Sequence, residues 1–260
     1  MNPIAHSIGG MGKLLNALYT RFQSPGLLKV ASQRELKFEW VVEAGCHDGT
    51  DTLKFLELPN VKKVCAFEPD QIAADKAEAK FAMHGERVEL KRIALMSYPG
   101  FIDISSPTGN FGDGTSVVKH SEIIHPDSAS NSSILKCSTM DLEVQNLGGN
   151  GLLWLDVEGS AAYVLRGAEE TLKSILLIQV EVDTHTSKYR KANFSEVDKI
   201  LRKSGFSMLY GPLHPGFFGD AIYIKRTYLN WYEQMKSGAI RHLYITLHLI
   251  IYPLTGRPKE

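Results

Sequence analysis

The sequence predicts an α/β protein built on a mostly parallel sheet, and three observations carry that prediction. Short apolar segments alternate with helical segments from residue 38 to residue 95, an order typical of parallel sheets. The most apolar short segment, at 152–157, is continuous, as expected of a strand that is buried on both faces. Two segments near the end, at 206–210 and 220–225, are close enough in sequence to pair antiparallel.

The composition bounds the class of protein. The chain has 260 residues, of which 43% are hydrophobic and 22% charged. It is therefore neither disordered nor collagen-like, and it is long enough to bury a core without cross-links. Lys and Arg total 29, as do Asp and Glu, and this balance argues against a nucleic acid as the main partner. The three cysteines, Cys46, Cys65 and Cys137, form no CxxC pair, which favours reduced thiols over disulfides or a structural zinc site.

The two ends of the chain are predicted to be helical additions to one α/β domain. Apolar residues within the first 22 positions fall on one helical face, and a Ser-Pro-Gly sequence at 24–26 ends that pattern. We expect an N-terminal helical extension over 1–37, a domain over 38–226 and a C-terminal helical appendage over 227–260. The sequence shows no signal-peptide core and no run of 18 apolar residues, so we expect a cytoplasmic protein without a spanning helix.

The first half of the domain alternates strands and helices. We expect strands at 38–43, 61–67 and 87–95, because aromatic and β-branched residues are concentrated there. A helix is expected at 50–58, where candidate N-cap residues precede an apolar pattern, and an alanine-rich helix at 71–84. This succession of elements predicts three neighbouring parallel strands.

The second half begins irregularly and then resumes the alternation. Short strands are expected at 100–105 and 115–120, followed by a polar loop at 121–133 and a segment at 135–144 that leads to a glycine-rich turn. The remaining elements are strands at 152–157, 174–182, 206–210 and 220–225 and helices at 160–172 and 195–204. The main sheet is thus predicted to have seven strands, of which the last is antiparallel.

The loop after the first strand is the most informative motif. It reads EAGCHDG over 43–49, and ligands of open α/β sheets bind at this end of the strands, where glycine permits close approach. Its G-x-x-x-G spacing differs from the G-x-G-x-x-G of dinucleotide sites. Glu43 would repel a pyrophosphate but suits an ammonium group, and Glu68, at the end of the next strand, suits ribose hydroxyls. This combination favours S-adenosylmethionine; the alternative is an ordinary βα turn with a solvated Glu68.

Several segments resemble one known family, the FkbM-type methyltransferases, over about residues 38–226. The resemblance rests on the loop at 43–49, Phe67-Glu68-Pro69, the STMD segment at 138–141, the block LDVEG followed by VLRGA within 155–168, and Glu181. Two positions depart from the family pattern. Trp154 stands where the family commonly has lysine, and Glu43 stands where aspartate is more usual.

The resemblance implies a Rossmann-like class I methyltransferase fold. It also implies transfer of a methyl group from S-adenosylmethionine to a hydroxyl oxygen of a small or glycan-type acceptor. We predict that the cofactor is bound by residues of the first loop, of the second and third strand ends and of the fourth strand end: Glu43, Gly45, Cys46, His47, Asp48, Gly49, Glu68, Pro69, Ala94 and Asp156.

The candidate catalytic residues are Asp156, Glu158 and His185. Asp156 and Glu158 follow the apolar strand two positions apart, so that in an extended chain both carboxylates would face one site. His185 follows the next strand and has the pKa best suited to a base near neutral pH. Alternatively, Glu158 caps the following helix, Asp156 fixes the loop, and His185 is merely solvated. The carboxylates would suit magnesium, but no tight ligand motif is present and no metal is predicted.

The sequence does not decide between this function and two others, and it leaves the binding partners open. Trp154 keeps open a non-catalytic S-adenosylmethionine-binding scaffold, and an NAD-dependent oxidoreductase is disfavoured by the glycine spacing. The apolar stretch 239–254 is expected to pack on its own domain or on a second subunit in a homodimer. The alternative for this stretch is a peripheral membrane contact.

Overall fold

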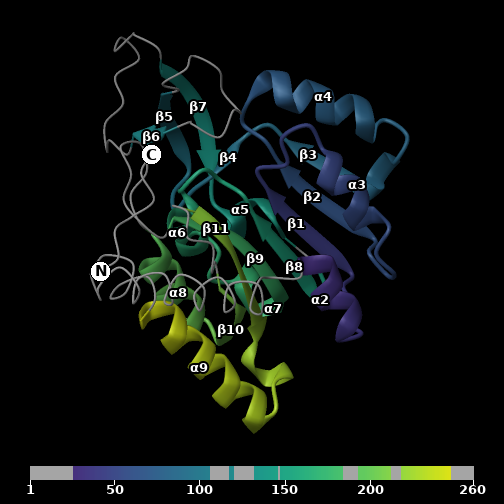
Figure 1. Ribbon diagram of the computed structural model, residues 1–260. Coiled ribbons are helices and arrows are strands. Elements are labelled where there is room, and N and C mark those ends of the chain that lie inside the picture. Colours follow the sequence, from purple (N-terminus) through teal and green to yellow (C-terminus); the bar gives the residue numbers. More distant parts are fainter. Residues whose placement is uncertain are drawn as a thin grey trace, which may run out of the picture.

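The computed structural model describes residues 26–105, 117–119, 132–145, 147–183, 193–211 and 218–246. Figure 1 shows a central twisted sheet with helices on both sides. Its strands have the order β10-β11-β9-β8-β1-β2-β3, and only β11 runs antiparallel to its neighbours. The predicted seven-stranded, mostly parallel sheet is confirmed. The strands are β1 (Trp40–Ala44), β2 (Lys63–Phe67), β3 (Val88–Lys91), β8 (Gly151–Leu155), β9 (Ile175–Asp183), β10 (Phe206–Tyr210) and β11 (Phe218–Lys225).

The alternation of side chains along β1 divides the core into two halves. Val41 belongs to the apolar cluster beneath α2 (Leu27–Gln33) and α3 (Thr50–Leu56), whereas Val42 belongs to the cluster beneath α6 (Ala161–Arg166) and α8 (Phe194–Lys203). Both residues are fully buried, as expected when successive side chains of a central strand point to opposite, covered faces. The helix α4 (Gln71–Phe81) covers β2 and β3 beside α3, and Figure 1 shows α2, α3 and α4 on the side away from α6 and α8.

The predicted helix at 160–172 is wrong in one respect, because the chain forms two helices there. The first, α6, ends at Gly167, where a Cβ atom would collide with the main-chain oxygen of Met96. The second, α7 (Thr171–Ser174), is capped by Asp141, whose carboxylate accepts the Thr171 N–H at 2.8 Å. A distant segment therefore breaks the helix at a glycine.

A second sheet, with the order β4-β7-β5-β6, stands beside the carboxyl ends of the main strands. Its strands are β4 (Ala94–Leu95), β5 (Gly100–Ser105), β6 (Val117–Lys119) and β7 (Ser132–Ser138). The predicted strand at 87–95 is therefore divided, since β3 belongs to the main sheet and β4 pairs with β7. The segment at 135–144 was expected only to lead into a turn, but it contains most of β7 and the short helix α5 (Met140–Glu143).

The described parts of both chain ends pack on the domain. In α2, Leu27 and Val30 are buried, and the Leu27 N–H donates to Gln179 Oε1 at 3.2 Å. The C-terminal helix α9 (Trp231–Thr246) lies on β10, where the Ser237 hydroxyl donates to the main-chain oxygen of Met208 at 2.6 Å. Two short 3₁₀ helices, η1 (Gly85–Arg87) and η2 (Arg226–Tyr228), complete the described elements. The domain limits at 37 and 227 stay predictions.

No helix within the described residues is long and apolar enough to cross a bilayer. Of the stretch 239–254, the structure describes the helix up to Thr246. The remainder of that stretch lies outside the described residues.

Candidate active site

A cavity of about 370 Å³ lies at the carboxyl ends of β1, β2 and β8 and extends to the second sheet. Its size is within the usual range for small-molecule sites, about 300–1,000 Å³. Of the predicted cofactor and catalytic residues, Gly49 does not line it and His185 lies outside the described residues. The ones that do are Glu43, Gly45, Cys46, His47, Asp48, Glu68, Pro69, Ala94, Asp156 and Glu158.

The loop between β1 and α3 is shaped by residues with left-handed backbones. Gly45 has φ 82° and lies against the β8 end, where a Cβ atom would collide with the main-chain oxygen of Asp156. His47 has φ 48°, which is uncommon for a residue other than glycine. Its N–H donates to Glu68 Oε2 at 2.8 Å. The first loop is therefore held against two neighbouring strand ends, and Gly45 is required there for its missing side chain.

Asp48 and Gly49 fix the start of α3. Lys80 of α4 bonds to Asp48 Oδ2 at 2.6 Å and to the Thr50 hydroxyl at 2.7 Å. These hydrogen bonds hold the pKa of the Asp48 carboxyl well below its usual range. Gly49 packs against the ring of Phe81, where a Cβ atom would overlap, and this explains why it lies behind the cavity wall. Through these contacts with Asp48 and Gly49, the helix α4 supports the loop.

Glu43 is a buried carboxyl group in the cavity wall. Its side chain is only 1% exposed, and it accepts a hydrogen bond from the hydroxyl of Thr52 on α3. The pKa of Glu43 is raised to about 8, chiefly by burial and in smaller part by the acidic residues Asp51, Asp156 and Glu68, while the hydrogen bond from Thr52 lowers it. The empty site therefore favours the protonated form of Glu43 at neutral pH.

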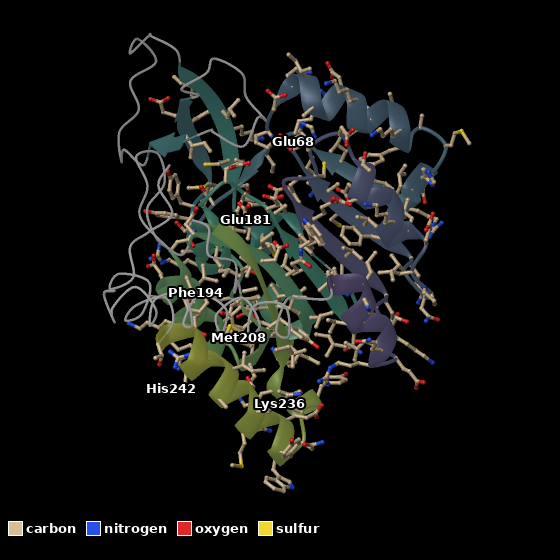
Figure 2. All side chains as sticks on the ribbon, in the orientation of Figure 1. Glu68, Glu181, Phe194, Met208, Lys236 and His242 are labelled. Carbon is tan, nitrogen blue, oxygen red and sulfur yellow. The ribbon has the colours of Figure 1, made fainter. Side chains whose placement is uncertain are left out.

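Glu68 follows β2 and has different partners. Its Oε2 accepts the His47 N–H at 2.8 Å, and its Oε1 accepts the Asp70 N–H at 2.9 Å. Burial raises the pKa of Glu68, and these two N–H donors oppose that shift. Each carboxylate oxygen has a second acceptor position, so Glu68 remains able to bind two ligand hydroxyls. Figure 2 shows Glu68 in the upper part of the view, toward the carboxyl ends of the strands.

Asp156 and Glu158 both line the cavity, but not as neighbours on one strand face. The expected strand at 152–157 ends at Leu155, and the chain turns through Glu158 with φ 48° and Gly159 with φ 81°. The side-chain amide of Asn193 donates to the Gly159 main-chain oxygen at 3.0 Å and thereby ties this turn to β9. A left-handed backbone at a residue other than glycine is a strained conformation, which is often found at functional sites.

The opposite wall is apolar, and the sequence prediction missed most of it. Ile93, Leu95 and Met96 come from the segment around β4, while Ile102 and Leu135 come from β5 and β7. Ile102 and Leu135 are direct partners in the second sheet, although 33 residues separate them in sequence. Ala94 was the single residue of this wall that the sequence indicated, and no local signal marks the others.

Trp154 contributes to the cavity on the side of Glu43. The two residues are paired in the parallel register of β1 and β8, so their side chains point to the same face of the sheet. The indole ring packs on Phe55 of α3 with ring centroids 5.4 Å apart. This chain therefore places an apolar ring beside a buried acid, at the position where the family resemblance implies lysine.

Other residues that the sequence singled out have structural roles or remain untested. Cys46 is 4% exposed and burial raises the pKa of its thiol, so it is a packing residue. Asp141, in the STMD segment, caps α7. Glu181, which forms part of the family resemblance, and Asp183 lie on β9 and do not line the cavity. Among the described residues, no three His, Cys, Asp or Glu side chains are grouped as a metal site requires.

The strand order and the cavity at the carboxyl ends of the strands are those of a Rossmann-like α/β fold with a ligand site. The family model described as the Methyltransferase FkbM domain matches residues 43–208. This match spans more than half of the chain, and the chain therefore belongs to the FkbM methyltransferase family.

The chain is also similar to individual proteins. It is 26% identical over 152 residues to 2-O-methyltransferase NoeI of Sinorhizobium fredii (strain NBRC 101917 / NGR234), which is 54% of this chain and 62% of NoeI. It thus matches less than two thirds of that relative's length. Methyltransferase FkbM from Methylobacillus flagellatus KT has 13% identity and a TM-score of 0.47, covering 72% of this chain and 43% of that chain. An S-adenosylmethionine-dependent methyltransferase from Clostridium acetobutylicum ATCC 824 has 9% identity and a TM-score of 0.43, covering 76% and 88%.

Proposed function

We propose that this protein transfers a methyl group from S-adenosylmethionine to a hydroxyl oxygen of a small or glycan-type acceptor. The observation that carries the proposal is the pairing of two buried carboxyl groups, Glu43 and Glu68, in one cavity of a chain that belongs to a methyltransferase family. An oxygen acceptor is supported by the name of the relative NoeI, a 2-O-methyltransferase.

The chemistry of the cavity wall fits this cofactor. Glu68 has free acceptor positions for the two hydroxyls of a ribose, and Glu43 offers a negative charge to an ammonium group. The described lining residues include seven carboxyl groups and neither lysine nor arginine: Glu43, Asp48, Asp51, Glu68, Asp70, Asp156 and Glu158. Such a wall favours a cationic ligand and disfavours a pyrophosphate. This supports S-adenosylmethionine over the NAD of the alternative oxidoreductase.

The bound cofactor would supply an electrophilic methyl group on a sulfonium. The protein's own residues must then position the acceptor hydroxyl and take its proton. Asp156 and Glu158 are the described carboxylates best placed for this, because they line the cavity at the β8 end. A positioned base contributes about 10²–10⁴-fold to such a reaction. His185 stays a predicted base, and it lies outside the described residues.

The apolar wall has a role in this proposal as well. Ile102 and Leu135 are held by the pairing of β5 with β7, so the wall is a fixed surface of a sheet. An apolar surface there excludes water from the transferred methyl group and strengthens the electrostatic contacts on the acidic side. Positioning of two reactants in this manner is worth up to about 7–11 kcal/mol of the barrier in favourable cases.

Calorimetric titration with S-adenosylmethionine, S-adenosylhomocysteine and NAD tests the proposal. The first two are expected to bind and NAD is not, because the wall is acidic. Glu68→Ala is expected to weaken binding by at least tenfold, since about 1.5–3 kcal/mol is typical for a hydrogen bond to a charged group. The matched control is Glu86→Ala, an exposed glutamate of η1. Binding of NAD alone would overturn the methyltransferase assignment.

A non-catalytic protein that binds S-adenosylmethionine is the second candidate, and Trp154 favours it. This ring lines the cavity where related sequences commonly have lysine. The measurement that separates the two candidates is transfer of a radioactive methyl group to a panel of glycosides. Transfer to any hydroxyl acceptor removes the scaffold reading, and binding without transfer to any member supports it.

The proposal includes the binding partners that the sequence predicts. We expect a small-molecule or glycan acceptor and no nucleic acid, as the balanced charge and acidic cavity favour. A homodimer or a peripheral membrane contact through 239–254 stays a prediction, and a change of solution size in detergent would favour the membrane contact.

A further inference from the structure

If the cavity binds S-adenosylmethionine as proposed above, the charge state of the buried Glu43 side chain affects that binding. Glu43, the second-to-last residue of β1, is almost completely buried, yet it lines the cavity and therefore meets a ligand that enters there. Among the described residues its hydrogen-bond partner is the Thr52 hydroxyl. A buried carboxylate is costly unless a cation or several donors compensate it.

Within the part of the chain that the structure describes, the elements packed around Glu43 provide no free cation. From α3 come Asp51 and Lys54, but the Lys54 ammonium is bound to Asp51 Oδ1 at 2.6 Å and its side chain is about half exposed. The ends of β8 and β2 contribute two further acids, Asp156 and Glu68. The adjacent strand positions are occupied by the neutral residues Trp154 of β8 and Ala66 of β2. The surroundings of Glu43 are therefore apolar or acidic.

We infer that Glu43 carries a proton while the cavity holds no cation and releases it to solvent when the ammonium group of S-adenosylmethionine enters. The ammonium then replaces the proton as the compensating positive charge. Cofactor binding is thereby coupled to proton release. The coupling follows from the local arrangement of one buried acid, one hydroxyl donor and three neighbouring acids.

The coupling has a defined dependence on pH. Burial raises the pKa of Glu43 to about 8 in the empty cavity, so about 0.9 proton is bound at pH 7 and is available for release. Affinity for the cofactor should therefore increase by nearly tenfold per pH unit between pH 6 and pH 7. It should level off above pH 8, where Glu43 becomes largely ionised and a free α-amino group itself loses its proton.

The experiment is calorimetry of S-adenosylmethionine binding at pH 7 in buffers of different ionisation enthalpy, which yields the number of protons released. We expect about 0.9 proton per site for the wild type, since pKa and pH differ by about one unit. S-adenosylhomocysteine, which keeps the ammonium group, should release a similar number. Methylthioadenosine, which lacks the amino-acid part, should release almost none.

The decisive variant is Glu43→Gln, which keeps the shape of the side chain and an acceptor for Thr52 but has no proton to release. It should show almost no proton release and a flat dependence of affinity on pH. Glu86→Gln is the matched control, because Glu86 is exposed and does not line the cavity. Thr52→Val is a second variant; removal of the hydroxyl donor should move the plateau of affinity to higher pH.

The outcomes separate this inference from the proposed function. If S-adenosylmethionine does not bind at all, the proposed function and the coupling both fail. If it binds without releasing a proton, or if Glu43→Gln still releases one, the coupling alone fails and the cofactor assignment stands. If Glu43→Gln fails to fold, the Thr52→Val shift decides, and an unchanged plateau would overturn the inference.

Discussion

Two glutamates of this chain show how the partners of a residue determine its role. Glu43 lies next to the last residue of β1, Glu68 directly follows the adjacent strand β2, and both line the same cavity. Glu68 receives two main-chain N–H groups, which favour its ionised form, whereas Glu43 receives one hydroxyl and faces other acids. Under the proposed function, residues of one type, 25 positions apart in sequence, would thus serve as an acceptor of ligand hydroxyls and as a group that exchanges a proton.

The free energy of unfolding of the unliganded protein should depend on the protonation state of Glu43. The native state holds the Glu43 proton up to a pKa of about 8, while an unfolded chain loses it near the ordinary glutamate pKa of 4.5. Between these values the native state binds more protons than the unfolded state, so the free energy of unfolding falls as pH rises. Relative to the wild type, Glu43→Gln should therefore become more stable by a few kcal/mol between pH 5 and pH 8, since each pKa unit is worth about 1.4 kcal/mol.

Denaturant unfolding of the unliganded protein at pH 5, 6.5 and 8 measures this difference. Glu86→Gln supplies the baseline for loss of an exposed carboxyl group. A difference between Glu43→Gln and wild type that does not change with pH would show that Glu43 is already ionised in the native state.

For single residues, the sequence predicted which carboxyl groups lie at the cavity better than it predicted the backbone geometry that places them there. Glu43 and Glu68 were found because strand ends can be located from apolar segments, and the glycine loop marks where a ligand approaches. The Asp156–Glu158 pair was also found, but its expected extended geometry was wrong because the left-handed turn at Glu158 depends on contacts from Asn193. Trp154 was noticed only as a departure, and its packing on Phe55 across the sheet could not be inferred from the sequence.

At the scale of elements, the β8–α6 turn depends on a residue from another part of the chain. Asn193, which precedes α8, accepts the Asp183 N–H at 2.9 Å through its side-chain oxygen and donates to the Gly159 main-chain oxygen at 3.0 Å. The two bonds join the end of β9 to the turn that holds Glu158. Asn193 is thereby a positioning residue for the carboxylates at the β8 end.

Asn193→Ala should destabilise the protein by about 1–3 kcal/mol, since it leaves buried main-chain groups without partners. It should also lower kcat of methyl transfer more than it raises the KM for S-adenosylmethionine, because the cofactor loop between β1 and α3 is not touched. Steady-state kinetics and denaturant unfolding measure the two effects. Ser195→Ala, two residues further on at an exposed position, is the control, and equal loss of kcat in both variants would contradict a positioning role.

Helices and strands were predicted correctly where the residues of a single segment are enough to define them. The strands β1, β2 and β8 were located to within a few residues because their apolar runs are buried on both faces. The helix expected at 160–172 divides because Gly167 lies against Met96, a contact between segments 71 positions apart. The strand expected at 87–95 divides because Ala94 pairs with Cys137. Both errors come from partners that a local pattern does not contain.

At the scale of the whole molecule, the C-terminal helix is fastened to the domain by a buried charge. Asp198 of α8 is 1% exposed and accepts bonds from Arg202 at 2.9 Å and from Arg241 of α9 at 2.8 Å. The Tyr223 hydroxyl of β11 bonds to its other oxygen at 3.3 Å. One carboxylate thus joins two helices and the antiparallel strand, and Figure 1 shows α9 lying along the β10 edge of the sheet.

Arg241→Ala should lower the free energy of unfolding by about 1.5–3 kcal/mol, because it removes a hydrogen bond to a buried charged group. Lys236→Ala, on the same helix and exposed, should change it by less than about 0.5 kcal/mol. Denaturant unfolding measures both values. Cofactor affinity should be unchanged in both variants, and equal stability of the two would show that Arg202 and Tyr223 suffice for Asp198.

The whole fold was easier to predict than the boundary of the site. The alternation of strands and helices and the two closely spaced segments near the end follow general rules of α/β connection, so the class of fold could be stated from the sequence. The apolar wall could not, because Ile102 and Leu135 meet only through the pairing of β5 with β7. A cavity with one wall from each of two sheets requires both sheets to be known.

The main sheet provides the acidic wall of the cavity and the second sheet provides most of the apolar wall, and this arrangement has an evolutionary consequence. The acidic wall is carried by strand ends whose apolar residues form the main core, and changes there would disturb the folding of the whole protein. The apolar wall comes largely from a small separate cluster around Met96, Ile102 and Cys137. Exchange of the segment that builds β5, β6 and β7 would reshape one side of the cavity while the main core stayed intact. The fold therefore permits descendants that share a cofactor and diverge in what they modify.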